Sequence, residues 1–499
     1  MRASDLARYE DGFGEGGFKR LMREGVTFTD AEYDYALTTT EAGLATLATG
    51  AQPSVHGVIG SSWWSHVDGK REELIVDKKS HPVPYSTGSV SCSAHRLQAP
   101  TLGDMLVGSN GKSMQFTVAI DPTTAIVLNG KRGVAYWVER NKTNWTTSTA
   151  FAENIPSWVE RYNSEGTNGF YRLGRWTPNG NVVNYLNDEV AVVEDIKGKR
   201  TKLLSDVSLT LDDTAYGQMC YTPAGNTMLL EFASQVVAQE HLGRDTATDL
   251  LNICLDTPRY IAEVYGPESI EYEDMLYRLD ADLAEFLTYI YAQVGSQRNV
   301  VVVLTSDHGT SPSYNPQGGV ARERFNNRQM EVIVNAFLGA RYGMGDYLLG
   351  YANNALYLNH ELLNTKKLAI AEIQEEVATF LLQLRGISSA ISATALRNTS
   401  FGEGRMRLVQ QSFHATRSGD VLIDFMPGWI VESTDYRSTS HAGYRYDRSV
   451  PLIISGGGIR PQRIDRTVSI VEVAPTVAKI MGIESPWACS SRPIVELDN

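Results

Sequence analysis

The sequence has no long apolar run: none of its stretches reaches the roughly 18 consecutive apolar residues that a membrane-spanning helix requires. Its first residues also lack the apolar core of a secretory signal peptide. Cysteine is scarce, and its four residues form neither a CxxC pair nor a zinc-finger spacing. We therefore expect no transmembrane segment and no signal peptide in this chain, and the cysteines leave the redox compartment open.

Basic residues are fewer than acidic residues. The chain carries 45 Lys and Arg against 58 Asp and Glu, which gives a formal net charge of −13 at pH 7. Nucleic-acid binding requires a basic face, so this balance argues against a nucleic-acid partner. A local basic pocket for a small anion stays compatible with it. The length of 499 residues predicts one large domain with insertions, or two domains.

Residues 300–304 are five consecutive apolar residues, four of them valine, and predict a strand buried on both faces. Asp307 and His308 follow directly, then Gly309. In open α/β sheets the chemistry gathers at the carboxyl ends of strands. A carboxylate beside an imidazole suits zinc there. Taken alone, the pair fits equally well an Asp that caps a turn beside a hydrogen-bonded His.

The order of elements around this strand indicates an α/β fold. A buried strand over residues 250–255 and an amphipathic helix over residues 270–294 precede it, which makes a βαβ unit. We expect a mostly parallel central sheet flanked by helices. Residues 129–245 contain few long apolar runs and are interpreted as a cap-like insertion. Residues 311–437 are interpreted as a second insertion. The core then consists of residues 1–128, 246–310 and 438–499.

Two further side chains are candidates for a site at this sheet edge. Thr40 begins a predicted helix, where free N–H groups and the helix dipole stabilise an anion. It either caps that helix or acts as a nucleophile, which metal coordination would activate. His441 precedes another predicted buried strand and is a third possible metal ligand.

Together these features resemble the zinc-dependent alkaline phosphatase superfamily, in particular bacterial threonine-nucleophile alkaline phosphatases and the related type I phosphodiesterase/nucleotide pyrophosphatase branch. The resemblance covers nearly the whole chain. It rests on short motifs in the same order and spacing: Gly14-Glu15-Gly16-Gly17-Phe18-Lys19-Arg20-Leu21, Ala45-Thr46-Leu47-Ala48-Thr49-Gly50, His56-Gly57-Val58, Gly266-Pro267-Glu268-Ser269, Thr305-Ser306-Asp307-His308-Gly309, Thr439-Ser440-His441-Ala442 and Val473-Ala474-Pro475-Thr476.

The resemblance implies a site with two zinc ions. One ion is bound by the nucleophile, here Thr40, by the Asp307 and His308 pair, and by an Asp on a first core strand. That strand and its Asp have no counterpart, because the chain begins where the family's first strand has just ended. We expect the first core strand to be missing, with late start-site assignment as one explanation.

The second zinc pocket departs from the family pattern. His441 matches its distant histidine, but an Asp and a His four residues apart are replaced by Arg259 and Glu263. Arginine stays charged and cannot ligate zinc. Glu263 and the nearby Asp256 remain possible ligands, and we expect Arg259 to replace the metal, neutralise acids or bind an anion.

Three phosphate-contacting positions depart as well. Leu44 stands where relatives have a histidine, Ser61 where they have an asparagine, and Asp121-Pro122-Thr123 where the monoesterase branch has Lys-x-Arg. We expect Ser61 to remain near the bound anion, whereas an acid in place of those cations would repel a phosphate dianion.

The resulting prediction is a metal-dependent hydrolase of phosphate mono- or diesters with a Thr40 nucleophile, impaired by these departures. The cofactor would be one or two Zn²⁺, with an incomplete or absent set equally compatible. The alternative is a pseudoenzyme that binds a phosphate ester or another small anion without turnover. The resemblance implies export to the periplasm, and the sequence predicts no oligomeric state.

Overall fold

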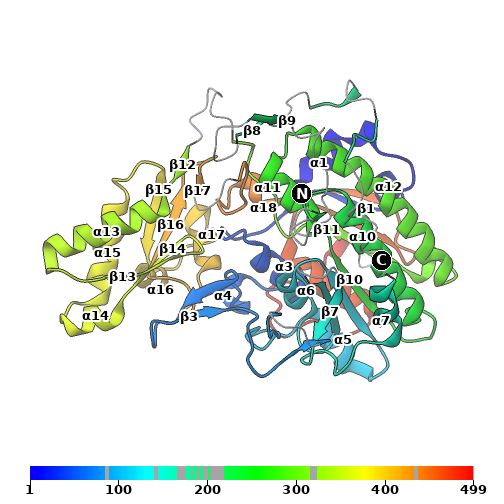
Figure 1. Ribbon diagram of the computed structural model, residues 1–499, viewed down its shortest axis with the longest axis horizontal. Coiled ribbons are helices and arrows are strands. Elements are labelled where there is room, and N and C mark those ends of the chain that lie inside the picture. Colours follow the sequence, from blue (N-terminus) through cyan, green and yellow to red (C-terminus); the bar gives the residue numbers. More distant parts are fainter. Residues whose placement is uncertain are drawn as a thin grey trace.

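The computed structural model describes residues 1–84, 89–139, 144–165, 176–180, 184–187, 192–194, 200–202, 219–314, 323–431 and 436–497. Figure 1 shows an α/β core that contains both ends of the chain, and beside it a smaller sheet with its own helices. Apolar side chains are buried in separate clusters in the two parts. No helix in the described ranges is long and apolar enough to cross a membrane.

The core contains two sheets. The first has the order β11-β18-β1-β19, and the second β10-β5-β6-β7-β4. The bounds in the first are Val301–Thr305, Ser449–Gly456, Gly25–Glu32 and Gln462–Ser469. Those in the second are Leu250–Cys254, Gln115–Ala119, Val134–Val138, Trp145–Ser148 and Pro82–Val83.

The expected α/β architecture is confirmed, with mixed rather than mostly parallel sheets. Strand β18 runs antiparallel to both β11 and β1, whereas β1 and β19 are parallel. In the second sheet β10, β5 and β6 are parallel. Strands β6 and β7 extend this sheet although both fall within the expected insertion of residues 129–245. Much of that insertion lies outside the described residues.

Strands β10 and β11 each form the edge of their sheet. Their apolar side chains pack against one common cluster, together with helices α10 (Ala224–Gln239) and α12 (Ile270–Gln293). Helix α12 forms where the sequence predicts it: the Ser269 side chain caps its first turn by accepting from Tyr272 N–H, and its apolar stripe faces the cluster.

The remaining core helices pack around the two sheets. They are α1 (Ala3–Arg8), α2 (Phe18–Glu24), α3 (Thr40–Thr49), α4 (Pro53–His56), α5 (Leu102–Asn110), α6 (Pro122–Asn129), α7 (Ser157–Ser164), α11 (Thr257–Tyr265), α18 (Arg445–Arg448) and α19 (Val473–Met481). A hairpin of β2 (Ser62–Trp64) and β3 (Arg71–Glu73) projects from the core toward the smaller sheet. Short strand pairs β8 (Val192–Glu194) with β9 (Arg200–Lys202), and β12 (Arg324–Phe325) with β17 (Ile430–Val431), complete the list.

The smaller sheet has the order β13-β14-β16-β15 and is antiparallel throughout. Its strands are Leu348–Ala352, Ala355–Leu358, Val421–Phe425 and Ile387–Ser392. Its helices are α13 (Asn327–Tyr342), α14 (His360–Thr365), α15 (Ile370–Leu381), α16 (Ala393–Asn398) and α17 (Gly404–Ser412). Helix α15 begins at Ile370, and Lys367 before it adopts a left-handed conformation with φ of 58°.

Candidate active site

The start of helix α3 presents the Thr40 side chain. The preceding Thr39 is the N-cap, since its hydroxyl accepts a hydrogen bond from Ala42 N–H at 3.2 Å. The interpretation of Thr40 as the capping residue is therefore wrong. Its hydroxyl is left for another partner, and Thr40 Oγ1 lies 3.0 Å from His308 Nε2.

The His308 ring is held in one tautomer. Its Nδ1–H donates to the Gly309 carbonyl at 2.6 Å, which leaves the lone pair on Nε2. Asp307 Oδ2 lies 3.2 Å from the same nitrogen. Burial lowers the pKa of His308, so the ring is neutral near pH 7. Burial would raise the pKa of Asp307, but electrostatic interactions with His308, the amino group of Met1 and Arg259 outweigh burial, and the pKa lies below its usual value.

Two glycines allow this close packing. A Cβ atom at Gly43, within α3, would lie 2.0 Å from the Asp307 carbonyl oxygen. A Cβ atom at Gly309 would lie 2.1 Å from the Tyr446 carbonyl oxygen. Helix α3 and the end of β11 therefore approach each other as closely as backbones can. Gly43 was not predicted as a site residue, although a glycine inside a helix is a signal for such an approach.

Arg259 lies among acids rather than in solvent. Its Nη2 is 4.0 Å from Asp256 Oδ1, its Nη1 is 3.7 Å from Glu263 Oε1, and its guanidinium stacks 4.3 Å from the centre of the Tyr260 ring. The charges of Asp307 and Glu41 also act on this group. Burial would lower the pKa of Arg259, but the surrounding acids raise it, so the side chain stays positive.

The two possible acidic ligands differ in their partners. Asp256 is 2% exposed, and its Oδ2 accepts from Ile120 N–H at 2.8 Å and Asp121 N–H at 3.1 Å. This carboxylate joins the ends of β10 and β5, and burial raises its pKa to about 6. Glu263 Oε2 has no hydrogen-bond partner in the described part of the chain, and burial raises the pKa of this side chain.

His441 is on the loop before α18, near the same groups. Desolvation by the surrounding protein, together with the charges of His308 and Arg259, lowers its pKa to about 4, although the residue remains open to water. The loop is tied to the segment that precedes Thr40, because the Thr38 hydroxyl donates to the Ser440 carbonyl. Ser61 is exposed before β2, and its carbonyl accepts from Leu74 N–H at 2.8 Å. Within the described residues, no side-chain hydrogen bond joins Ser61 to Thr40 or Arg259.

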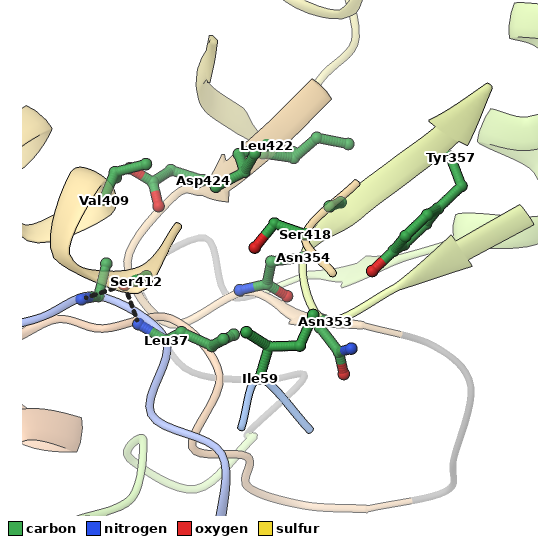
Figure 2. A pocket seen from close by; sticks show the side chains of 13 residues that line it. Leu37, Ile59, Asn353, Asn354, Tyr357, Val409, Ser412, Ser418, Leu422 and Asp424 are labelled. Atoms are coloured by element: carbon green, nitrogen blue, oxygen red, sulfur yellow. Dashed lines mark hydrogen bonds between the residues drawn. The ribbon is translucent and has the colours of Figure 1, made fainter. Parts of the chain in front are cut away.

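A small cavity lies beneath the segment that leads to Thr40. Its volume is about 30 Å³, and it separates Ala36 and Leu37 from Asn353 and Asn354 of the smaller sheet. Figure 2 shows Ser412 of α17 bridging to this segment, where its hydroxyl accepts from the Ala36 and Leu37 N–H groups at 2.9 Å each. The cavity has room for water and not for a phosphate ester, so it marks a structural junction.

The donor atoms fit one cation better than two. Thr40 Oγ1, the His308 Nε2 lone pair and the Asp307 carboxylate converge, and a neutral imidazole with a carboxylate is a suitable zinc set. The second zinc position implied by the resemblance lies beside Glu263, where the Arg259 guanidinium already supplies a positive charge. The residues at this position therefore do not fit a metal ion. No group of three His, Cys, Asp or Glu ligand atoms converges at either position in the described ranges.

The sequence matches the type I phosphodiesterase/nucleotide pyrophosphatase family over residues 1–445. The chain belongs to this family. It is 28% identical to alkaline phosphatase PafA of Elizabethkingia meningoseptica over 505 residues, which cover 100% of this chain and 92% of that protein. It is also 28% identical over 509 residues to a Myroides odoratus protein named calcium-transporting ATPase, with 99% and 92% covered.

The crystal structure of wild-type PafA matches with a TM-score of 0.92 and 27% identity, covering 100% of this chain and 97% of that one. This agreement confirms membership of the alkaline phosphatase superfamily and the fold expected from the sequence motifs. The full coverage gives no support to the expectation that a first core strand is missing.

Proposed function

We propose that this family member is a phosphate-ester hydrolase with Thr40 as its nucleophile. The observation that supports this best is the 3.0 Å contact between Thr40 Oγ1 and the Nε2 atom of His308. The Thr39 cap leaves the Thr40 hydroxyl free, and the Gly309 carbonyl fixes the tautomer of its partner. Similarity to alkaline phosphatases indicates the substrate class, a phosphate monoester or diester.

In the proposed reaction Thr40 Oγ1 attacks phosphorus. Because His308 Nε2 accepts, the hydroxyl hydrogen is directed toward the imidazole and the lone pairs of Oγ1 face the substrate. A Thr40–phosphorus bond forms as the hydroxyl proton passes to His308 Nε2 and the bond to the leaving alkoxide breaks, and that alkoxide takes a proton from solvent. Water then releases Thr40 as phosphate departs. In this second step the attacking water loses a proton to solvent, and His308 returns its proton to Thr40 Oγ1. A Zn²⁺ ion held by Thr40, Asp307 and His308 would take the Nε2 lone pair in place of the hydroxyl hydrogen, and it would supply positive charge that lowers the pKa of the hydroxyl.

Arg259 stands in for the second cation in this proposal. Its charge offsets Glu263 and Asp256 and faces the site, where it can attract a phosphate oxygen. A fixed guanidinium cannot ligate the leaving oxygen as a metal does, so we expect slow turnover. Glu263, Asp256 and His441 then serve as electrostatic neighbours rather than as a complete metal set, and Ser61 contributes little. The natural location would be the periplasm, as the family resemblance implies.

The second candidate is a pseudoenzyme that binds a small anion. It is favoured by Asp121 at the segment where related monoesterases carry cations, because a carboxylate there opposes binding of a dianion. The two candidates differ in turnover, which a direct assay measures.

The test uses purified full-length chain with added Zn²⁺ and aryl phosphate mono- and diesters. We expect slow release of the aryl alcohol, a loss of at least about 1000-fold in kcat for Thr40→Ala, and partial retention in Thr40→Ser, which keeps the oxygen. Turnover that survives Thr40→Ala would assign the activity to a contaminant and contradict the nucleophile. No turnover by the wild type, with inorganic phosphate still bound, would support the pseudoenzyme.

A further inference from the structure

A second group of potential metal ligands lies where the hairpin of β2 and β3 meets the smaller sheet. His66 is in the turn of that hairpin, His360 is the first residue of α14, and Asp420 directly precedes β16. One ligand atom from each residue lies within 4.8 Å of the other two. In the part of the chain that the structure describes, these residues form the single group of this kind.

The spacing suits a small divalent cation. His360 Nε2 is 2.8 Å from Asp420 Oδ1, and His66 Nδ1 is 3.8 Å from Asp420 Oδ2. Zinc bonds of 2.0–2.2 Å in a tetrahedron place ligand atoms about 3.3 Å apart, between these two distances. The two distances run to different oxygens of Asp420, and the three ligand atoms lie within 4.8 Å of one another, so their separations would close by up to about 1.5 Å on one ion.

The His66 ring has an unused nitrogen that points to a ligand. Its Nε2–H donates to the Ser418 carbonyl at 2.8 Å, so the lone pair is on Nδ1. That Nδ1 atom is buried and has no hydrogen-bond partner among the residues that the structure describes. The ring is also oriented by stacking on His360, with centroids 5.0 Å apart and planes 24° apart. A buried acceptor without a donor is costly, and a cation would remove that cost.

The carboxylate is held in place by neighbours outside the ligand set. Asp420 is 2% exposed; its Oδ2 accepts from Leu358 N–H at 2.8 Å and its Oδ1 from Gln374 Nε2 at 2.7 Å. Such supporting hydrogen bonds are typical of metal sites. The three ligands border a cavity of about 730 Å³ that also contains Arg397 and Arg417. Water or a small anion could complete the coordination from that side.

We infer that His66, His360 and Asp420 form a binding site for a divalent transition-metal cation, Zn²⁺ in the first instance. Binding through His360 Nε2 moves the proton that this atom now donates to Asp420 onto Nδ1 of the same ring, so the ligand is the neutral imidazole. The ion joins the core hairpin to the smaller sheet, so it stabilises the contact between the two parts of the molecule. The inference is independent of the function proposed for Thr40.

The test is a titration of metal-free full-length protein with Zn²⁺ against a chromophoric chelator, with thermal unfolding in parallel. His66→Gln is expected to weaken one binding event at least about tenfold and to remove its zinc-dependent rise in Tm. His360→Gln, which keeps a donor for Asp420, should do the same. His308→Gln should retain this binding event, because it alters only the site at Thr40.

His95→Gln is the matched control. His95 Nδ1 also lies 3.8 Å from a carboxylate oxygen, Asp77 Oδ2, but no second histidine joins that pair. This variant should bind Zn²⁺ as the wild type does. Circular dichroism verifies that each variant is folded. If either folded variant at His66 or His360 binds Zn²⁺ with wild-type stoichiometry and affinity, the group is a hydrogen-bond network only and the inference is overturned.

Discussion

Two of the histidine–aspartate groups in the described part of the chain are built in different ways. At Thr40, the ligands Asp307 and His308 are adjacent in sequence, and a backbone carbonyl fixes the ring so that Nε2 faces a hydroxyl. In the smaller sheet region, three distant segments contribute His66, His360 and Asp420, and the free nitrogen is Nδ1. The first group faces the Thr40 hydroxyl, the nucleophile that we propose, and the Arg259 guanidinium, whereas the second faces a cavity of about 730 Å³. We therefore propose that the first group serves hydrolysis at Thr40, whereas a metal ion at the second holds the hairpin of β2 and β3 against the smaller sheet.

The first group depends on a close backbone approach, so Gly43→Ala should have the largest effect. The added Cβ would lie 2.0 Å from the Asp307 carbonyl oxygen, and either α3 or the end of β11 must move. We expect a loss of about 3 kcal/mol in the free energy of unfolding and a displaced Asp307. Denaturant unfolding measures the loss.

Gly339→Ala is the control for this change. Gly339 lies within α13, has no atom within 4 Å of an added Cβ, and should gain about 0.5–1 kcal/mol from the alanine. Equal effects of the two substitutions would show that the approach of α3 to Asp307 is not tight.

The Arg259 guanidinium is a fixed positive charge beside the first group. Arg259→Gln leaves Asp256 and Glu263 without their positive neighbour, and we expect a loss of about 2 kcal/mol at pH 7.5. The pKa of Asp256 is raised to about 6, so the folded state holds this proton more tightly than the unfolded state. Below about pH 6 the carboxyl is neutral and the missing charge costs less. The loss should therefore shrink between pH 7.5 and pH 5, as unfolding at both values would show.

Arg278→Gln is a useful comparison for this variant. Arg278 Nε lies 2.9 Å from Asp274 Oδ2, but Asp274 also accepts from Trp176 and Tyr185 side chains. Those bonds keep the carboxylate satisfied, so this substitution should cost less than Arg259→Gln. A larger cost at Arg278, or a pH-independent cost at Arg259, would contradict the assigned role of the acid cluster.

A substitution beside the second group tests whether Asp420 needs its hydrogen-bond donor Gln374 to bind a metal ion. Gln374→Met removes the donor to Asp420 Oδ1 and the acceptor of Thr394 N–H. We expect about 1 kcal/mol lower stability and about tenfold weaker binding of Zn²⁺ at this group, with no change at Thr40. Gln383 is exposed, and Gln383→Met should change neither the stability nor the affinity for Zn²⁺. Unaltered affinity in Gln374→Met would mean that Asp420 does not need this support.

The first group could be predicted from sequence because its parts are local signals. A valine-rich strand followed by Asp307 and His308, and a threonine at a helix start, place three side chains at one edge. The position of the N-cap at Thr39 rather than Thr40 could not be predicted, because both residues suit a cap. Gly43 was missed because the atom it accommodates, the Asp307 carbonyl oxygen, is 264 positions away in the printed numbering.

The second group had no sequence signal. His66, His360 and Asp420 are isolated in sequence, and only the packing of the hairpin against the smaller sheet brings them together. The role of Asp256 was also hidden, since its bonds to backbone N–H groups of Ile120 and Asp121 depend on the pairing of β10 with β5. The resemblance suggested Ser61 at the anion, and the fold places it on an exposed turn.

The most direct test is anomalous scattering at the zinc edge from crystals grown with Zn²⁺. The account predicts one peak beside Thr40, Asp307 and His308, one beside His66, His360 and Asp420, and Arg259 still paired with its acids. A peak between Glu263 and His441, with Arg259 turned toward solvent, would contradict it.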